Sequence, residues 1–180
     1  MDSHFLRTSI RPIPPVERHT EYVEAGPLTV GIEYRVLADD ISVANNLPRP
    51  PESKTGRPAS AIRDRGVTLH VFQRKGDKLA EYLRFDCFDE SPHYHYVQAS
   101  GEYQEIYQLD PVADGDPLAW ALERLRTRLP QMLEKIGAGD LVKTMNQQEI
   151  DEALPKIAEA AYRARFESDE EAIHQGAVAV

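Results

Sequence analysis

The periodicity of the apolar residues changes once along this chain, close to residue 110. Between residues 21 and 110, several segments alternate apolar and polar residues, most strictly in 28–36, where the apolar set is Leu28, Val30, Ile32, Tyr34 and Val36. Such alternation is typical of β-strands that bury one face of a sheet. From residue 116 the apolar residues recur at the spacing of amphipathic helices. The sequence therefore predicts an α+β fold, with an antiparallel sheet of about five or six strands over residues 21–110 packed against C-terminal helices over residues 116–166.

Prolines help to place the ends of the helices. Asp116 followed by Pro117 is typical of a helix start, with an acidic cap and proline in the first turn. Pro130 falls inside the apolar stripe that follows, so we expect a kink just before it, where a backbone hydrogen bond is lost. A second helix is expected to begin after a cap at Asn146 and to be divided at Pro155.

The length of 180 residues suits one domain with short extensions. The N-terminal segment contains Pro12, Pro14 and Pro15 and little periodicity, which predicts an arm that is either mobile or docked on a neighbouring surface. The segment 39–65 has no clear periodicity and is expected to be a surface insertion or a lid. These features divide the chain into three parts. Residues 1–20 form an extended proline-rich arm, residues 21–166 form a single α+β domain with a long loop at 39–65, and residues 167–180 form a C-terminal tail.

Composition narrows the expected partners and compartment. The formal net charge is −9, which disfavours nucleic acid as the main partner because phosphate binding needs clustered Lys and Arg. No apolar run approaches the roughly 18–20 residues of a membrane span, and the N-terminus lacks the pattern of a signal peptide, so we expect neither membrane insertion nor export. The single cysteine, Cys87, agrees with a reducing cytoplasm, which is the expected localisation.

The stretch Tyr82–Tyr96, which reads YLRFDCFDESPHYHY, concentrates ionisable and aromatic residues. His93 and His95 stand two apart on a predicted strand, so both imidazoles project from the same face and can reach one divalent ion such as zinc, iron or manganese. Asp86, His70 and Glu102 are the candidates for a third metal ligand. The alternative is that the two histidines are half-buried members of an aromatic sheet face, hydrogen-bonded to carboxylates.

Two further pairs in this stretch are candidate binding residues. Arg84 and Asp86 share one strand face, either as an ion pair or as an anion-binding arginine with its orienting acid. Tyr94 and Tyr96 are candidates for stacking on a planar ligand, with a packed sheet face or a contact between protomers as the alternatives. Cys87 falls on the other strand face and is expected to be a small buried hydrophobic residue, not a nucleophile.

The run LRFDCFDESPHYHY, together with GDPLAWALERLRTRLPQML, resembles a bacterial family described as a domain of unknown function. The resemblance covers roughly residues 20–140. Its most specific element is RFD at 84–86 followed by PHYH at 92–95. It implies no particular activity.

Four residues, Arg84, Asp86, His93 and His95, also resemble a pattern in a small toxin family of toxin–antitoxin pairs. This looser resemblance implies a nuclease that cuts RNA. Cys87 stands where the toxin pattern has asparagine, and the acidic net charge also departs from what an RNA-cutting protein would prefer.

Three hypotheses about function stay open. The first is a cytoplasmic binding or accessory protein, oligomeric or a subunit of a larger complex, because an apolar arm and an aromatic sheet face suit partner binding. The second is a small metal-dependent enzyme that uses His93 and His95 as ligands. The third is a toxin-like ribonuclease, with a histidine as general base and Arg84 steadying the phosphate.

Overall fold

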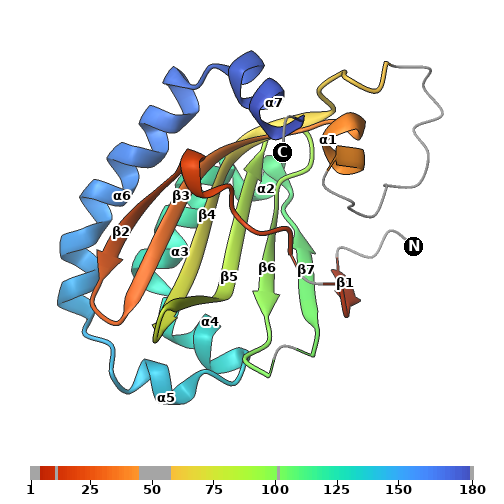
Figure 1. The fold of residues 1–180 in the computed structure, drawn as a ribbon. Helices are drawn as coiled ribbons and strands as arrows, with labels where there is room; N and C mark the ends of the chain where they lie inside the picture. Colours follow the sequence, from red (N-terminus) through yellow and green to blue (C-terminus); the bar gives the residue numbers. More distant parts are fainter. Residues whose placement is uncertain (1–4, 11, 45–57, 101, 179–180) are drawn as a thin grey trace.

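An antiparallel sheet forms the centre of the chain. The computed structural model describes residues 5–10, 12–44, 58–100 and 102–178. Within these residues the sheet has seven strands in the spatial order β1-β7-β6-β5-β4-β3-β2 (Figure 1). The strands are β1 Phe5–Thr8, β2 Thr20–Ala25, β3 Leu28–Leu37, β4 Asp64–Lys75, β5 Lys78–Phe88, β6 His93–Val97 and β7 Gln104–Gln108. The predicted sheet is confirmed as β2 to β7, and the N-terminal segment adds β1 as an edge strand.

Two-residue turns close the hairpins β2–β3 and β4–β5. Each turn begins with a glycine, Gly26 or Gly76, that has a φ of 61°. Glycine adopts a positive φ with little strain, whereas a residue with a Cβ atom does so at a cost. The two turns therefore fix the register of both hairpins, in which Ala25 pairs with Leu28 and Lys75 pairs with Lys78.

A β-bulge in β5 changes which side chains face the helices. Val71 pairs with Leu83, but its neighbour Phe72 pairs with Glu81, so Tyr82 is an extra residue without a cross-strand partner. A simple alternation along β5 would place Glu81 on the same face as Leu83. The structure corrects this, because Tyr82 belongs to the hydrophobic core and Glu81 turns to the opposite face of the sheet.

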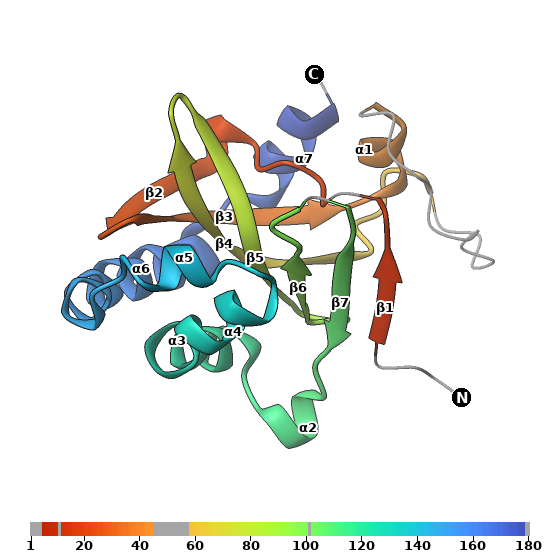
Figure 2. The ribbon, with the colours of Figure 1, turned by 90° about the horizontal axis from the view of Figure 1, so that it is seen from below.

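Most of the helices that follow the sheet in sequence cover one of its faces. The helices are α1 Asp39–Ala44, α2 Pro111–Asp114, α3 Pro117–Thr127, α4 Leu129–Lys135, α5 Gly139–Val142, α6 Gln147–Glu167 and α7 Glu170–Val178, with one 3₁₀ turn at Glu17–His19. α6 lies across β2, β3 and β4, and α3 lies against β5 and α6. Figure 2 shows α3 to α6 beneath the sheet, whereas the segment between β1 and β2 crosses above it. The predicted α+β fold class is confirmed.

The hydrophobic core lies between the sheet and α3, α4 and α6. The central strands and these helices contribute side chains that are at most 2% exposed: Val30, Leu69, Leu83, Phe85, Leu125, Leu129, Leu133 and Ile157. Burial of a large apolar side chain contributes about 1.5–3 kcal/mol relative to its exposed state. This core therefore provides the rigid support on which the opposite, polar face of the sheet is built.

The helices follow the sequence signals in three places and depart from them in one. Asn146 caps α6, because its side chain accepts a hydrogen bond of 3.0 Å from the N–H of Gln148. Asp116 caps α3, because its side chain accepts a hydrogen bond of 2.8 Å from the N–H of Ala119. The apolar stripe breaks at Arg128, between α3 and α4, which agrees with the kink predicted from Pro130. The prediction that Pro155 divides the second helix is wrong, because α6 runs through it. Pro155 is exposed, so water can satisfy the backbone carbonyl that it leaves unpaired while the buried side of α6 stays packed.

Helices also occupy parts of the predicted loop and tail. α1 begins the segment 39–65, and α7 fills most of the segment 167–180. Residues 45–57, which belong to the predicted loop, lie outside the described residues. None of the helices that the structure describes combines the length and the hydropathy that crossing a bilayer requires.

Helix α7 is held by residues that are distant in the sequence. Glu170 accepts hydrogen bonds from Tyr34 at 2.7 Å and from Arg65 at 2.9 Å. His174 lies 3.0 Å from the carboxylate of Asp40 in α1. Contacts of this kind have no local sequence signature, which is why periodicity alone indicated a tail.

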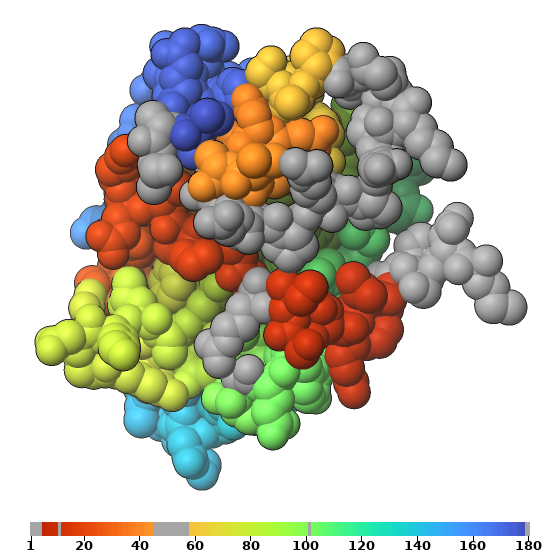
Figure 3. All heavy atoms as spheres, turned by 45° about the vertical axis from the view of Figure 1, so that its right-hand side comes forward, coloured from red at the N-terminus to blue at the C-terminus, as the bar shows by residue number. Residues whose placement is uncertain are grey.

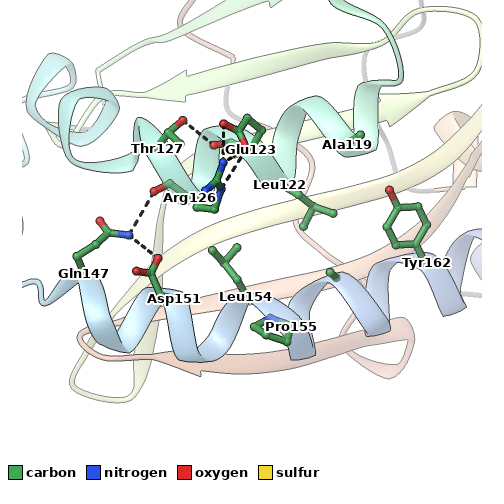
Figure 4. Close-up of a pocket in the computed structure, with 11 residues that line it drawn as sticks. Ala119, Leu122, Glu123, Arg126, Thr127, Gln147, Asp151, Leu154, Pro155 and Tyr162 are labelled. Carbon is green, nitrogen blue, oxygen red and sulfur yellow. Dashed lines mark hydrogen bonds and ion pairs between the residues drawn. The ribbon is translucent and has the colours of Figure 1, made fainter.

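A groove of about 670 Å³ lies between α3 and α6 (Figure 4). Leu122 and Leu154 line its middle, and Tyr162 lies toward one end. Near the other end, the amide of Gln147 donates a hydrogen bond of 3.2 Å to the backbone carbonyl of Arg126. The two helices are thus joined by a polar contact at the rim as well as through the core beneath them.

The two most different phenylalanine environments allow a test of the core. Phe85 is 1% exposed and Phe166 is 76% exposed. We expect Phe85→Ala to lower the free energy of unfolding by about 3–5 kcal/mol, because it leaves a cavity under the sheet. The matched change Phe166→Ala is expected to stay within about 0.5 kcal/mol. Urea denaturation followed by circular dichroism measures both, and equal losses would contradict the described core.

Candidate metal centre

The face of the sheet opposite the helices is polar and yet buried. Two rows of cross-strand neighbours run over β3 to β6: Glu33, Thr68, Asp86 and His93 in one row, and Gly31, His70, Arg84 and His95 in the other. Apart from His93, the polar members of these rows are at most 6% exposed. Burial of charged groups is costly unless each one finds a partner, so this face must satisfy its own hydrogen bonds.

The segment between β1 and β2 covers this face and supplies some of those partners. The backbone carbonyl of Ile13 accepts a hydrogen bond from Arg84, and the carbonyl of Ile10 accepts one from Gln104. In the space-filling view, the red N-terminal residues lie beside the green strands β6 and β7 (Figure 3). The described part of the predicted arm is therefore docked on the sheet of its own chain.

Asp86, His93 and His95 form a compact cluster on this face. Asp86 lies directly opposite His93 across β5 and β6, and His95 is its diagonal neighbour. Oδ2 of Asp86 lies 2.9 Å from Nε2 of His95 and 3.3 Å from Nε2 of His93. The other oxygen, Oδ1, accepts a hydrogen bond of 2.7 Å from Thr68. Potential ligand atoms of the three residues all lie within 4.8 Å of one another, as the sequence predicted for His93, His95 and Asp86.

The partners of the two Nδ1 atoms fix which ring nitrogen faces Asp86. Nδ1 of His93 lies 2.7 Å from the backbone carbonyl of Ser91, which only accepts, so this nitrogen carries a proton. Nδ1 of His95 lies 2.7 Å from Oε1 of Gln104. The Gln104 amide is oriented because its Nε2 donates to a backbone carbonyl, so Oε1 is an acceptor and Nδ1 of His95 is a donor. Both Nε2 atoms therefore converge on one carboxylate oxygen, and each needs a proton or a cation there.

The electrostatics of the cluster favour a charged Asp86. Burial raises the pKa of this carboxyl, but hydrogen bonds from His93 and His95 outweigh burial and hold the pKa well below its ordinary value. For His93, burial lowers the pKa, and the hydrogen bond to Asp86 outweighs it, so the pKa is raised. In the absence of a metal, these shifts favour a carboxylate at Asp86 beside a protonated imidazole at His93.

A second cluster on the same face satisfies itself. Nδ1 of His70 lies 2.7 Å from Glu81, and its Nε2 lies 3.3 Å from Glu33. Arg84 donates to both oxygens of Glu81, each at 3.0 Å. His70, a candidate ligand by sequence, therefore lies between two carboxylates and apart from the Asp86 cluster. The partner of Arg84 is Glu81, whereas the sequence had suggested Asp86.

Strand alternation separates the four candidate binding residues onto two faces. Tyr94 and Tyr96 belong to the core on the helix side, where the ring of Tyr94 lies 5.2 Å from that of Trp120. Arg84 and Asp86 lie on the opposite face. The two pairs therefore do not share one site, and Tyr94 and Tyr96 lie in the packed sheet face that the sequence left open as an alternative to ligand stacking.

Cys87 also lies on the helix side, next to the start of α3. Its Sγ lies 3.5 Å from the backbone carbonyl of Pro117. Burial raises the pKa of the Cys87 thiol well above its ordinary value, and the charge of Asp86 adds to this effect. The thiol is therefore kept protonated, which does not suit a nucleophile.

Several residues of this polar face, among them Glu33, Glu81 and Gln104, were not among the candidates from the sequence. Glu33 falls at a position of the strand pattern where exposure is the usual outcome. Glu81 reaches this face only because of the bulge at Tyr82. Gln104 is on β7, and its role depends on the arm that orients its amide. One sequence signal could have indicated this polar face: acidic and basic residues recur at the positions of consecutive strands that alternate with the apolar core positions.

The fold and the site together define a class of protein. Its described residues form an α+β protein with one antiparallel sheet, with α3 to α6 on one face and a largely buried Asp–His–His cluster on the other. A family described as a domain of unknown function (DUF7700) matches residues 22–161, and the chain belongs to this family. Comparisons with curated proteins and with solved structures gave no match. The predicted membership of a family of unknown function is thus confirmed, and it assigns no activity.

The pKa values of His93 and His19 are shifted in opposite directions, so the two residues should affect stability with opposite pH dependence. The pKa of His93 is raised in the folded protein, so the stability that it adds is full below the unfolded value of about 6.5 and is lost as the pH rises through the folded value. In EDTA-treated protein, we expect the stability difference between wild type and His93→Gln to be larger at pH 5.5 than at pH 8.5. Urea denaturation at both pH values measures it.

His19 serves as the control with the opposite sign. Burial, aided by the charge of Arg18, lowers the pKa of His19 below its ordinary value of about 6.5. Folding therefore opposes protonation of His19, and its contribution to stability increases as the pH rises through the folded and unfolded pKa values. The difference between wild type and His19→Gln should therefore be more favourable to wild type at pH 8.5 than at pH 5.5. The same pH trend for both variants would count against the described environments.

Proposed function

We propose that this protein binds one divalent transition-metal ion through Asp86, His93 and His95. The observation that carries the proposal is the orientation of the two imidazoles. Each Nδ1 donates to an oxygen that only accepts, from Ser91 for His93 and from Gln104 for His95, so Nε2 is the nitrogen of each ring that would present its lone pair to a metal ion beside Asp86. Histidine ligands in proteins are usually held in this way, by a hydrogen bond from the other ring nitrogen.

The separation of the ligand atoms supports the proposal. Neighbouring ligand atoms of a tetrahedral zinc ion, each about 2.0–2.2 Å from the metal, lie about 3.3–3.6 Å apart. The two Nε2 atoms lie 3.3 Å and 2.9 Å from Oδ2 of Asp86, so small side-chain movements would admit an ion. Two neutral imidazoles and one carboxylate suit zinc or iron(II), with manganese as a weaker fit because it prefers oxygen ligands.

Three protein ligands favour a functional metal over a purely structural one. Structural zinc sites are usually closed by four protein ligands, whereas three leave a position for water or substrate, which the metal would polarise. The side chain of His93 is 18% exposed, more than those of Asp86 and His95, so solvent reaches the cluster from the His93 side. We therefore put forward a metal-dependent activity at this site, with its substrate left open.

Metal analysis of untagged protein tests the proposal. We expect about one zinc or iron ion per chain, and the double variant His93→Ala/His95→Ala to lose it because two of three ligands are gone. Metal at a hundred times its Kd should add about 2.7 kcal/mol to the stability of the wild type and nothing to the double variant. Mass spectrometry of the metal content and isothermal titration calorimetry measure these outcomes.

His174→Ala is the matched control, because His174 also pairs with an aspartate, Asp40, at 3.0 Å but has no second histidine beside it. This variant should bind metal as the wild type does. Gln104→Leu, which removes the acceptor for His95, should weaken binding about 10–100-fold while leaving all three ligands present. Wild-type protein that takes up no metal, or equal losses in the control, would overturn the proposal.

A second candidate function is that of an oligomeric or accessory protein. It is favoured by apolar exposure at the edge of the sheet. Phe5 and Leu6 of the edge strand β1 are 39% and 56% exposed, and Ile10, two residues after β1, is 55% exposed. Exposed edges with apolar side chains are common contact surfaces for another chain. Size-exclusion chromatography with light scattering should then show a dimer or larger species that Leu6→Lys shifts to monomer. A monomer at all concentrations, without a co-purifying protein, would remove this candidate.

The nuclease hypothesis has less support. Arg84, which would steady a phosphate, is 2% exposed and is engaged by Glu81 and by the carbonyl of Ile13. A guanidinium in this state is not available to an RNA backbone. We therefore leave ribonuclease activity as a hypothesis from the toxin resemblance alone.

A further inference from the structure

In addition to the groove between α3 and α6, the protein has a cavity at the end of β3, next to the polar face of the sheet. Its volume is about 350 Å³, at the small end of the range of about 300–1,000 Å³ that is usual for ligand pockets. Its walls come from the segment before β2, from β3, from α1 and from α7, so four separate parts of the chain meet there. Most of its lining is apolar, including Ile13, Val36, Ile41 and Ile173.

The walls of this cavity are fixed by polar contacts. Tyr34 donates a hydrogen bond of 2.7 Å to Glu170, which ties the start of α7 to β3. His174 and Asp40, 3.0 Å apart, tie the middle of α7 to α1. Arg18 donates to the backbone carbonyl of Gly176 near the end of α7. Three contacts along one helix indicate a built enclosure instead of a gap left by loose packing.

Arg35 is the charged group that distinguishes this cavity. Its side chain is 11% exposed, and its Nε lies 3.0 Å from Oε1 of Glu33. Among the described residues, no other hydrogen bond or ion pair reaches this guanidinium, so the N–H groups of its two terminal nitrogens are left for another partner. Arg84, the fully buried arginine of this face, is by contrast engaged by Glu81 and the carbonyl of Ile13.

The negative charge in the same cavity is already matched. Oε1 of Glu33 faces Arg35 and His70, and Oε2 accepts hydrogen bonds from the N–H of Val16 at 3.0 Å and from Thr20 at 3.2 Å. Both oxygens of Glu33 therefore have partners within the chain. The group that remains to recognise a ligand is Arg35, which favours an anion.

We propose that this cavity binds a small monocarboxylate with a short apolar tail. The carboxylate would accept hydrogen bonds from both terminal nitrogens of Arg35, the geometry that suits a guanidinium best. The tail would lie against Ile13, Val36, Ile41 and Ile173. The proposal does not depend on the metal centre, because the cavity contains none of its three ligands. The larger groove between α3 and α6 contains no comparable buried cation.

Isothermal titration calorimetry with three probes of equal chain length tests the charge requirement. Octanoate should bind, and 1-octanol should bind about tenfold or more weakly, because it lacks the charge-assisted hydrogen bonds. Octylammonium should not bind, since its charge repels Arg35. Equal affinity for octanoate and octanol, or no heat from octanoate up to millimolar concentration, would overturn the proposal.

Variants then test the location. Arg35→Met should weaken octanoate binding about tenfold or more, and Arg35→Lys should weaken it less because the charge remains. Arg74→Met is the matched control, since Arg74 lies on β4 with 57% of its side chain exposed. Ala177→Phe places a ring at the α7 wall and should abolish binding without touching Arg35. Circular dichroism confirms that each variant is folded. Unchanged binding in Ala177→Phe, or equal losses in Arg74→Met, would show that octanoate binds elsewhere.

Discussion

The carboxylate of Asp86 is the interaction on which the polar face depends. It is 4% exposed and contacts Thr68, His93 and His95, so it links β4, β5 and β6 through side chains as well as through the backbone ladder. A buried carboxylate without such partners would cost several kcal/mol or become protonated. The positions opposite Asp86 must therefore carry donors, and this requirement explains why two histidines stand where an ordinary sheet would carry apolar or exposed residues.

The two clusters of this face differ in how their hydrogen bonds are completed. In the cluster of Glu33, His70, Glu81 and Arg84, donors and acceptors from the chain match one another. In the cluster of Asp86, two imidazole nitrogens meet one oxygen, and the described residues contribute no further ligand to this group. A complete network serves stability and specificity, whereas an incomplete one leaves room for an external cation. This difference is the physical reason for assigning ligand binding to the second cluster and not to the first.

The sequence was informative where a local pattern decides the outcome. The alternation of apolar and polar residues predicted the strands and placed His93 and His95 on one face. The short connection between β5 and β6 then places Asp86 opposite His93. The pattern failed where a single residue changed its phase, as at Tyr82 in the bulge. It also could not indicate Glu33 or Gln104, because their roles depend on strands and an arm that meet them only in the folded chain.

The prolines of the arm help to explain how it can lie on a charged face. A segment that crosses a buried surface must satisfy its own backbone N–H groups, and proline has none. Between β1 and β2, Pro12, Pro14 and Pro15 therefore remove donors that would otherwise need acceptors, while the carbonyls of Ile10 and Ile13 accept from Gln104 and Arg84. Gln104 and Arg84 beneath it carry donors that need acceptors, so a proline-rich segment is a suitable cover. The same contacts orient Gln104 and, through it, His95, so the arm contributes to the geometry of the metal centre without supplying a ligand.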